Sequence, residues 1–174
     1  MKPNTSLLYT AFGSPIGRIF LALTEKGLCA VGINEREKDF INTLEKAYNI
    51  KPVKDNTAFS EFARLLKRYL NGERLEIEIP LDMKGTDFEK RVWKTLLKIP
   101  YGRTKSYGEI AREIDLPKGA RAVGNACGKN PTPIIVPCHR VVAGNSGLGG
   151  YSGGIGIKKR LLRIEGVLCC KESS

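Results

Sequence analysis

The sequence predicts an α/β (α+β) protein in which a small N-terminal antiparallel sheet with helices is followed by a mainly helical C-terminal domain with a helix-turn-helix. Three observations support this prediction: short apolar runs between turn signals near the start, two helix-opening motifs in the second half, and a concentration of positive charge there. With 174 residues, 41% of them hydrophobic and 27% charged, the composition is that of a globular protein.

The first predicted elements are three strands of a β-meander within residues 6–32. The apolar runs LLYTAF, GRIFLAL and LCAVGI are separated by the turn signals GSPIG and TEKG. Charged helical patterns follow at about 35–48 and 58–71, and LEIEIP then alternates as a short strand ended by Pro80. This half contains no catalytic cluster, so we expect residues 1–82 to form a strand-rich scaffold domain.

The second predicted domain, residues 83–168, opens with the amphipathic helix TDFEKRVWKTLLKI, in which Thr86 and Glu89 have the spacing of a capping box. Ser106 and Glu109 form a second capping box at the start of the helix SYGEIAREI. The breaker DLPKG separates this helix from a third one, ARAVGNACGKN. Two short helices joined by a tight turn predict a helix-turn-helix, although an ordinary αα-hairpin is the commoner structure.

The second helix of that pair carries small side chains, with Arg121 and Asn125 as its only sizeable polar residues. Recognition helices that read a DNA sequence present several long polar side chains to base edges. A smooth helix instead suits a close backbone approach that reads little sequence. Tight helix packing would require the same smoothness, so the pattern by itself also fits a structural role.

The only histidine of the chain follows a cysteine in VPCHRVV. The segment NPTPIIVPC predicts that Cys138 lies at the mouth of a buried strand, after Pro137. A cysteine there can simply fill the core, but the adjacent His139, the nearby prolines and the basic setting favour a nucleophile. Because neighbouring side chains diverge, His139 would need a bridging water to reach the thiol and a carboxylate to orient its ring.

The segment AGNSGLGGYSGGIG, residues 143–156, is half glycine. It is either mobile or allows something to approach its backbone closely, and the missing GKS or GKT argues against a phosphate-binding P-loop. The pattern IKKRLLRIEG predicts a last helix that ends near Glu165, with Gly166 as its cap. Taken alone, Glu165 would be a solvated carboxylate at a helix end.

Positive charge is concentrated from Lys84 to Glu165, where 16 Lys or Arg residues face 6 Asp or Glu residues. This distribution indicates a polyanionic partner for the C-terminal half, or a surface tuned for solubility. No segment has the apolar length of a signal peptide or membrane span, so we expect a cytoplasmic protein without membrane contact, whose five cysteines are free thiols. One His and no CxxC make a zinc site unlikely to form by ordinary ligand spacing, and we expect no metal.

Several motifs together resemble the O6-alkylguanine-DNA alkyltransferase family, also called methylated-DNA protein-cysteine methyltransferases. They are PCHRVV, the preceding RAVGNACGKNPTPI, and the following YSGG and LLRIEG. The resemblance is strong from Phe88 to Gly166, while the N-terminal half agrees in length and strand-rich layout. It implies that residues 83–168 bind DNA, flip O6-alkylguanine out of the duplex and transfer its alkyl group irreversibly to a cysteine, once per protein. No cofactor is expected, because the damaged DNA supplies the alkyl group.

The resemblance also implies roles for individual residues. Cys138 would accept the alkyl group, His139 would act on it through a water, and Glu165 would orient His139. The other catalytic assignments are Asn130, as the hinge between the helix pair and the active-site segment, and Tyr107, which would protonate the departing guanine.

The remaining implied roles concern DNA and the base pocket. The helix of Arg121, Ala122, Gly124 and Asn125 would enter the minor groove of double-stranded DNA, with Arg121 filling the gap left by the flipped base. Cys127, Val141, Tyr151, Ser152 and Gly153 would form the pocket, with Ser152 contacting the guanine oxygen and the carbonyls of Cys138 and Val141 receiving the exocyclic amine. We expect a monomer in solution.

Two other functions share parts of this pattern. A non-catalytic helix-turn-helix DNA-binding protein would have the same basic helices but more base-reading side chains, and a cysteine hydrolase would need a second histidine from elsewhere in the chain. Family members that do not transfer alkyl groups lack the acceptor cysteine, which is present here. Cys169 and Cys170 fall in a predicted tail, residues 169–174, and have no functional account.

Overall fold

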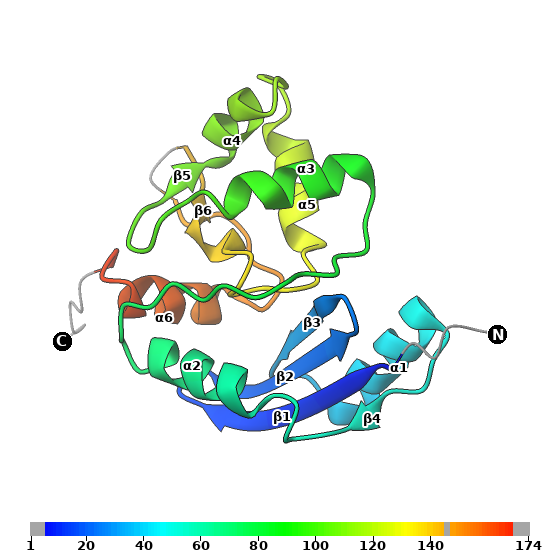
Figure 1. The fold of residues 1–174 in the computed structure, drawn as a ribbon. Coiled ribbons are helices and arrows are strands. Elements are labelled where there is room, and N and C mark those ends of the chain that lie inside the picture. Colours follow the sequence, from blue (N-terminus) through cyan, green and yellow to red (C-terminus); the bar gives the residue numbers. More distant parts are fainter. Residues whose placement is uncertain (1–5, 145–146, 169–174) are drawn as a thin grey trace. The chain divides into compact units, whose positions relative to one another are not determined.

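The computed structural model describes residues 6–144 and 147–168 (Figure 1). Contacts within the chain divide it into two compact units, one ending at Lys84 and the other beginning at Gly85. Cys169 and Cys170 lie outside the described residues.

The first unit is built on a sheet with the strand order β3-β2-β1-β4. The strands β1 (Leu8–Ser14), β2 (Gly17–Thr24) and β3 (Gly27–Ile33) pair antiparallel, which confirms the predicted meander. The turn between β1 and β2 requires glycine at position 17, because its φ is +113° and a Cβ there would lie 1.8 Å from Asn34 Oδ1.

Two features of this sheet differ from the sequence prediction. A short strand β4 (Val53–Lys54) pairs parallel with β1, and the sequence missed it because both of its residues are exposed and show no alternation. The predicted strand LEIEIP is wrong. Residues 75–80 form no ladder with any strand; an isolated bridge pairs Leu28 only with Leu81, the residue after the segment, and Pro80 has no N–H to extend that pairing.

The helices α1 (Glu37–Tyr48) and α2 (Ser60–Leu70) form as predicted. Phe40 and Leu44 of α1 pack on the sheet face that carries Phe20 and Ala22 of β2, with the rings of Phe20 and Phe40 centred 5.2 Å apart. This core contains Cys29, and burial raises the pKa of that thiol to about 11, as expected of a structural cysteine.

The second unit contains α3 (Asp87–Leu96), α4 (Tyr107–Glu113), α5 (Ala120–Gly128) and α6 (Ile155–Ile164) (Figure 1). Both predicted capping boxes are present. The hydroxyl of Thr86 accepts from the Glu89 N–H and that of Ser106 from the Glu109 N–H, while each Glu side chain accepts from the N–H of its N-cap residue. These bonds satisfy helix-end donors that would otherwise lack partners, which is why the sequence places these two helix starts correctly.

The helices α4 and α5 form the predicted pair of short helices joined by a tight turn, and α3 packs against both of them. The indole Nε1 of Trp93 donates a buried hydrogen bond of 2.8 Å to the carbonyl of Ala126, which fixes α5 on α3. The small side chains of α5 allow this close packing while one of its sides stays open toward a pocket.

The segment before Cys138 is not the buried strand that its apolar residues predicted. Residues 131–137 form turns, Ile134 has a φ of +77°, and Cys138 opens a short 3-10 helix, η1 (Cys138–Arg140). Pro131, Pro133 and Pro137 lack the N–H groups that a strand ladder needs. After η1, β6 (Val141–Val142) pairs parallel with β5 (Lys105–Ser106), and α6 starts two residues earlier than predicted.

Candidate active site

Cys138 is held at the start of η1 by Asn130, which follows α5. The side-chain Nδ2 of Asn130 lies 3.2 Å from Cys138 Sγ and donates to the carbonyl of Val136 at 2.8 Å. Its Oδ1 accepts from the backbone N–H of Thr132 at 3.0 Å. One buried amide therefore connects the end of α5, the turn that follows it and the thiol.

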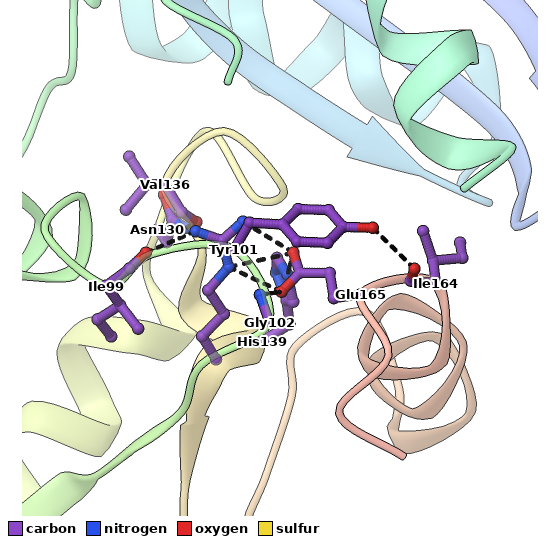
Figure 2. A network of polar contacts seen from close by, with 9 residues as sticks. Ile99, Tyr101, Gly102, Asn130, Val136, His139, Ile164 and Glu165 are labelled. Carbon is purple, nitrogen blue, oxygen red and sulfur yellow. Dashed lines mark hydrogen bonds and ion pairs between the residues drawn. The ribbon is translucent and has the colours of Figure 1, made fainter. Parts of the chain in front are cut away.

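The ring of His139 faces Glu165 at the end of α6 (Figure 2). Nε2 of the ring lies 2.9 Å from Glu165 Oε1, and both side chains are fully buried. Because a carboxylate only accepts hydrogen bonds, Nε2 is the protonated nitrogen and the basic lone pair lies on Nδ1. Burial lowers the pKa of His139, while the hydrogen bond to Glu165 acts in the opposite direction, so we infer a neutral imidazole with a fixed tautomer.

The negative charge of Glu165 is balanced by a second partner, Arg140, which the sequence did not indicate. The guanidinium of Arg140 donates to both carboxylate oxygens, with Nε 3.1 and 2.9 Å away and Nη2 2.8 Å from Oε1. Its Nη1 donates to the carbonyl of Ile99 at 2.6 Å. A buried carboxylate is costly unless it is paired and fully hydrogen-bonded, so Arg140 allows Glu165 to stay buried beside a neutral histidine.

The loop before β5 completes the surroundings of Glu165 (Figure 2). The backbone N–H of Gly102 donates to Glu165 Oε2 at 3.3 Å, and the hydroxyl of Tyr101 donates to the carbonyl of Ile164 at 2.8 Å. These bonds fasten the C-terminal end of α6, so that the carboxylate faces η1.

A buried lysine lies close to the thiol. Lys158 of α6 is 0% exposed, and its Nζ donates to the carbonyls of Val141 at 2.5 Å and Gly150 at 3.1 Å. Burial raises the pKa of Cys138, whereas the Asn130 hydrogen bond and the charge of Lys158 act to lower it. Burial likewise lowers the pKa of Lys158, and the nearby thiols oppose this effect.

Sequence reasoning missed Lys158, although a signal was present. Position 158 lies three and four residues before Leu161 and Leu162, and therefore on the apolar face of α6. A lysine on a buried helix face needs acceptors, and here it finds two backbone carbonyls. Arg140 belongs to the PCHR motif, but nothing in the sequence indicated that it would share Glu165.

A pocket of about 410 Å³ opens in front of Cys138. Its walls come from α5, the start of α4 and the glycine-rich segment; the predicted site residues among them are Tyr107, Arg121, Gly124, Asn125, Cys127, Cys138, Tyr151 and Ser152. His139, Glu165 and Asn130 lie buried behind it. Ala122, Val141 and Gly153, also predicted for DNA or pocket contacts, are not among its lining residues.

Two carbonyls that were expected to receive the guanine amine already accept one hydrogen bond each. The carbonyl of Val141 accepts from Lys158 Nζ, and that of Cys138 accepts from the N–H of Val141. Each carbonyl has a second lone pair. The roles of these carbonyls therefore remain predictions.

Tyr107 and the glycine-rich segment fit closely together. The hydroxyl of Tyr107 donates to the carbonyl of Gly150 at 3.3 Å, and its ring packs against Gly149. Burial, followed by the two nearby thiols Cys127 and Cys138, raises the pKa of Tyr107. A protonated hydroxyl at the pocket wall can serve as a proton donor. Burial raises the pKa of Cys127 to about 12, so this second pocket thiol is protonated at neutral pH.

Within the described residues, no group of three or more His, Cys, Asp or Glu side chains is placed to bind a metal ion. Among these residues, no helix has the length and apolar character needed to cross a membrane.

Comparisons with known proteins place this geometry in a family. A profile described as 6-O-methylguanine DNA methyltransferase, DNA binding domain matches residues 87–167, and one for the ribonuclease-like domain of the same methyltransferase matches residues 7–83. A methylated-DNA–protein-cysteine methyltransferase of Methanosarcina acetivorans is 43% identical over 160 residues, covering 92% of this chain and 99% of the relative. The protein of that name from Mycobacterium bovis is 47% identical, covering 90% and 91%.

Among solved structures, Mycobacterium tuberculosis OGT in complex with DNA superposes with a TM-score of 0.80 at 44% identity, covering 91% of this chain and 92% of that one. O6-methylguanine-DNA methyltransferase from Pyrococcus kodakaraensis superposes with a TM-score of 0.64 at 26% identity, covering 92% and 99%.

Proposed function

The chain belongs to the 6-O-methylguanine DNA methyltransferase family, and from this premise we propose that it repairs O6-alkylguanine in duplex DNA by transferring the alkyl group to its own Cys138. The activity is that of a methylated-DNA–[protein]-cysteine S-methyltransferase. One observation carries the assignment of Cys138: its thiol opens into a pocket, and a buried His139–Glu165 pair lies directly behind it.

The first step is activation of the thiol. In the resting protein burial keeps Cys138 protonated, so the reaction needs a base. His139 takes the proton on Nδ1 through a bridging water, and Glu165 stabilises the imidazolium that forms. Arg140 holds the carboxylate in place, and Lys158 and Asn130 stabilise the new thiolate.

The second step is displacement at the alkyl carbon. The Cys138 sulfur forms a bond to this carbon while the bond from carbon to guanine O6 breaks, and the electron pair moves onto the base. Tyr107 donates a proton to the departing guanine, and Ser152, which also lines the pocket, contacts its oxygen. A thioether has no easy return route, so each protein reacts once.

The DNA lies against α5, which presents its small side chains to the minor groove. We expect Arg121, exposed at the pocket edge, to enter the base stack in place of the flipped guanine. We expect close backbone contacts with DNA at Ala122, Gly124 and Asn125, and we expect Cys127 and Tyr151, which line the pocket, to contact the base. Roles for Val141 and Gly153, which do not line the pocket, are expected from the family resemblance alone. The protein acts as a monomer and without a cofactor, in the cytoplasm, where an acceptor thiol stays reduced.

The names of the relatives favour transfer over a non-catalytic DNA-binding function. A DNA-binding protein without catalysis would also have no need of the buried Cys138, His139 and Glu165 arrangement.

A single-turnover experiment tests the proposal. The protein is mixed with a duplex that contains O6-methylguanine, and intact and peptide mass spectrometry follow. We expect a gain of one methyl group on the Cys138 peptide that saturates at one per chain. Cys138→Ser should abolish the gain, whereas the matched variant Cys127→Ser, which changes the other pocket thiol, should keep it. A wild-type protein that binds this duplex but leaves Cys138 unmodified would disprove the proposal and favour the non-catalytic alternative.

A further inference from the structure

The outer face of α3 carries a row of cations that the proposed reaction does not use. We call Lys90, Arg91, Lys94 and Lys98 the basic stripe. Lys90, Lys94 and Lys98 are four residues apart, so they follow one side of the helix and its last turn at intervals of about 6 Å. Arg91, Lys94 and Lys98 are exposed and Lys90 is half-buried.

The basic stripe lies on the side of α3 that faces away from α5. The opposite side of α3 buries Val92, Trp93 and Leu96, and Trp93 bonds to the backbone of α5. Arg121 and Asn125 line the pocket on α5. A duplex docked on α5 is therefore separated from the basic stripe by the thickness of α3, and the stripe is free to contact something else.

Within the described residues, none of the ion pairs includes a member of the basic stripe. In the first unit, by contrast, Arg18 and Lys54 pair with Glu37. A helix normally gains from pairing its exposed lysines with carboxylates three or four residues away, and this face of α3 has none at those positions beyond Asp87 at its start.

The basic stripe borders a groove of about 500 Å³ between α3 and the end of α4. Three carboxylates also line the groove: Asp87, Glu113 and Asp115. Glu113 is paired with Lys105, and Asp87 and Asp115 form no ion pair within the described part of the chain, so four cations face two such carboxylates. The net potential of this face is positive, and it suits an anionic polymer that spans the length of the stripe.

We propose that the basic stripe is a second DNA-binding surface, which binds the phosphate backbone of a duplex segment other than the one docked on α5. Lysine side chains are flexible point charges that neutralise phosphates without reading bases. Phosphates of one strand rise by about 3.4 Å each, so lysines about 6 Å apart can each find one. One protein can then hold two duplex segments. The inference rests on the proposed function only in that the partner is DNA.

A bridging experiment tests the inference. Protein is loaded on a bead-bound duplex of 12 base pairs at low salt, and a soluble fluorescent duplex of another sequence is added. We expect the wild type to retain the second duplex and K90Q/K94Q/K98Q to retain at least about tenfold less. Each phosphate contact adds about 0.9 to the steepness with which log K rises as the salt concentration falls, so a variant that loses three contacts binds more weakly at low salt. The matched control K38Q/K46Q/K51Q removes the same charge from exposed positions of α1 and the residues after it, and should behave as the wild type.

Two results would overturn the inference: equal retention by K90Q/K94Q/K98Q and the wild type, or no retention by the wild type. Methyl transfer from a 12-base-pair duplex, measured in parallel, should proceed at the wild-type rate in K90Q/K94Q/K98Q and shows that this variant is folded. A wild type that bridges duplexes but accepts no methyl group would leave the second surface standing and refute the proposed repair function, so the two failures are distinguishable.

Discussion

At the scale of single residues, Cys138 and His139 are neighbours in sequence with different partners in space. Cys138 bonds to Asn130 from the end of α5, and His139 bonds to Glu165 from the end of α6. Arg140, two positions after Cys138, also has a different partner, because its guanidinium donates to the carboxylate of Glu165. The divergence of adjacent side chains is the reason why the proposed mechanism links Cys138 and His139 through a water.

The buried His139 predicts a pH-dependent stability. Burial lowers its pKa in the folded state, so below the ordinary value of about 6.5 the unfolded chain binds a proton that the folded chain resists. The free energy of unfolding should therefore fall as the pH drops from about 7.5 to about 5.5, by up to ~1.4 kcal/mol in total. Urea unfolding at the two pH values measures this change.

The chain contains one histidine, so His139→Gln is a clean control. The variant should lose most of the pH dependence in this window, because the carboxylates with shifted pKa values, except Glu35, have lowered values and titrate at lower pH. Identical pH dependence in the wild type and the variant would show that His139 is not the responsible group.

Lys158 predicts a change in thiol reactivity. In Lys158→Met the charge that favours the Cys138 thiolate is lost, so the pKa of Cys138 should rise. Alkylation of Cys138 by iodoacetamide, followed by peptide mass spectrometry across a pH series, should need a higher pH than in the wild type, and methyl transfer at pH 7.5 should slow by about tenfold or more.

Lys159→Met is the matched control for this experiment, because the adjacent Lys159 is exposed. It should leave the pH profile unchanged. If Lys158→Met also leaves it unchanged, Lys158 serves only to bind the carbonyls of Val141 and Gly150.

At the scale of elements, the site depends on how the glycine-rich segment meets α4. Gly149 has a φ of +69°, and a Cβ there would lie 2.7 Å from the ring of Tyr107 and 2.9 Å from its hydroxyl. Gly149→Ala should therefore displace Tyr107 from the pocket wall. We expect single-turnover methyl transfer to slow on the order of 10- to 100-fold, because misplacing a catalytic group by about 1 Å has effects of this size.

Gly156→Ala provides the comparison, since nothing lies within 4 Å of a Cβ at this position on α6. It should react at the wild-type rate. Equal rates in Gly149→Ala and Gly156→Ala would show that the position of Tyr107 does not limit transfer.

At the scale of the whole molecule, the two units differ in charge. From Gly85 onward the chain has 16 basic and 7 acidic residues, whereas up to Lys84 it has 13 and 11. The unit that contains the pocket therefore supplies the electrostatic attraction to DNA.

DNA binding should consequently weaken with salt. Each neutralised phosphate contributes about −0.9 to the slope of log K against log salt concentration, and a basic surface of this size predicts a slope steeper than about −3. Fluorescence anisotropy with an undamaged duplex between 50 and 200 mM NaCl measures it. A slope near zero would mean that the excess positive charge faces away from the phosphates.

The sequence by itself determined the parts of this protein that depend on local chemistry. The capping residues Thr86 and Ser106 place two helix starts because their bonds close within four residues, and the alternation of β1 to β3 and the turn at Gly17 define the meander. PCHR and its flanking motifs were enough to select the family and to name several residues that line the pocket, among them Tyr107 and Ser152, although Val141 and Gly153 do not line it.

Only the tertiary structure decided which distant groups meet. The short strand β4 exists because β1 offers it an edge, and LEIEIP fails as a strand because no strand of the sheet forms a ladder with it. The burial of Glu165, its second partner Arg140, and the placement of Lys158 beside the thiol all join segments 17 or more residues apart. Charge pairing and desolvation depend on distance in space, and periodicity along the chain carries no information about it.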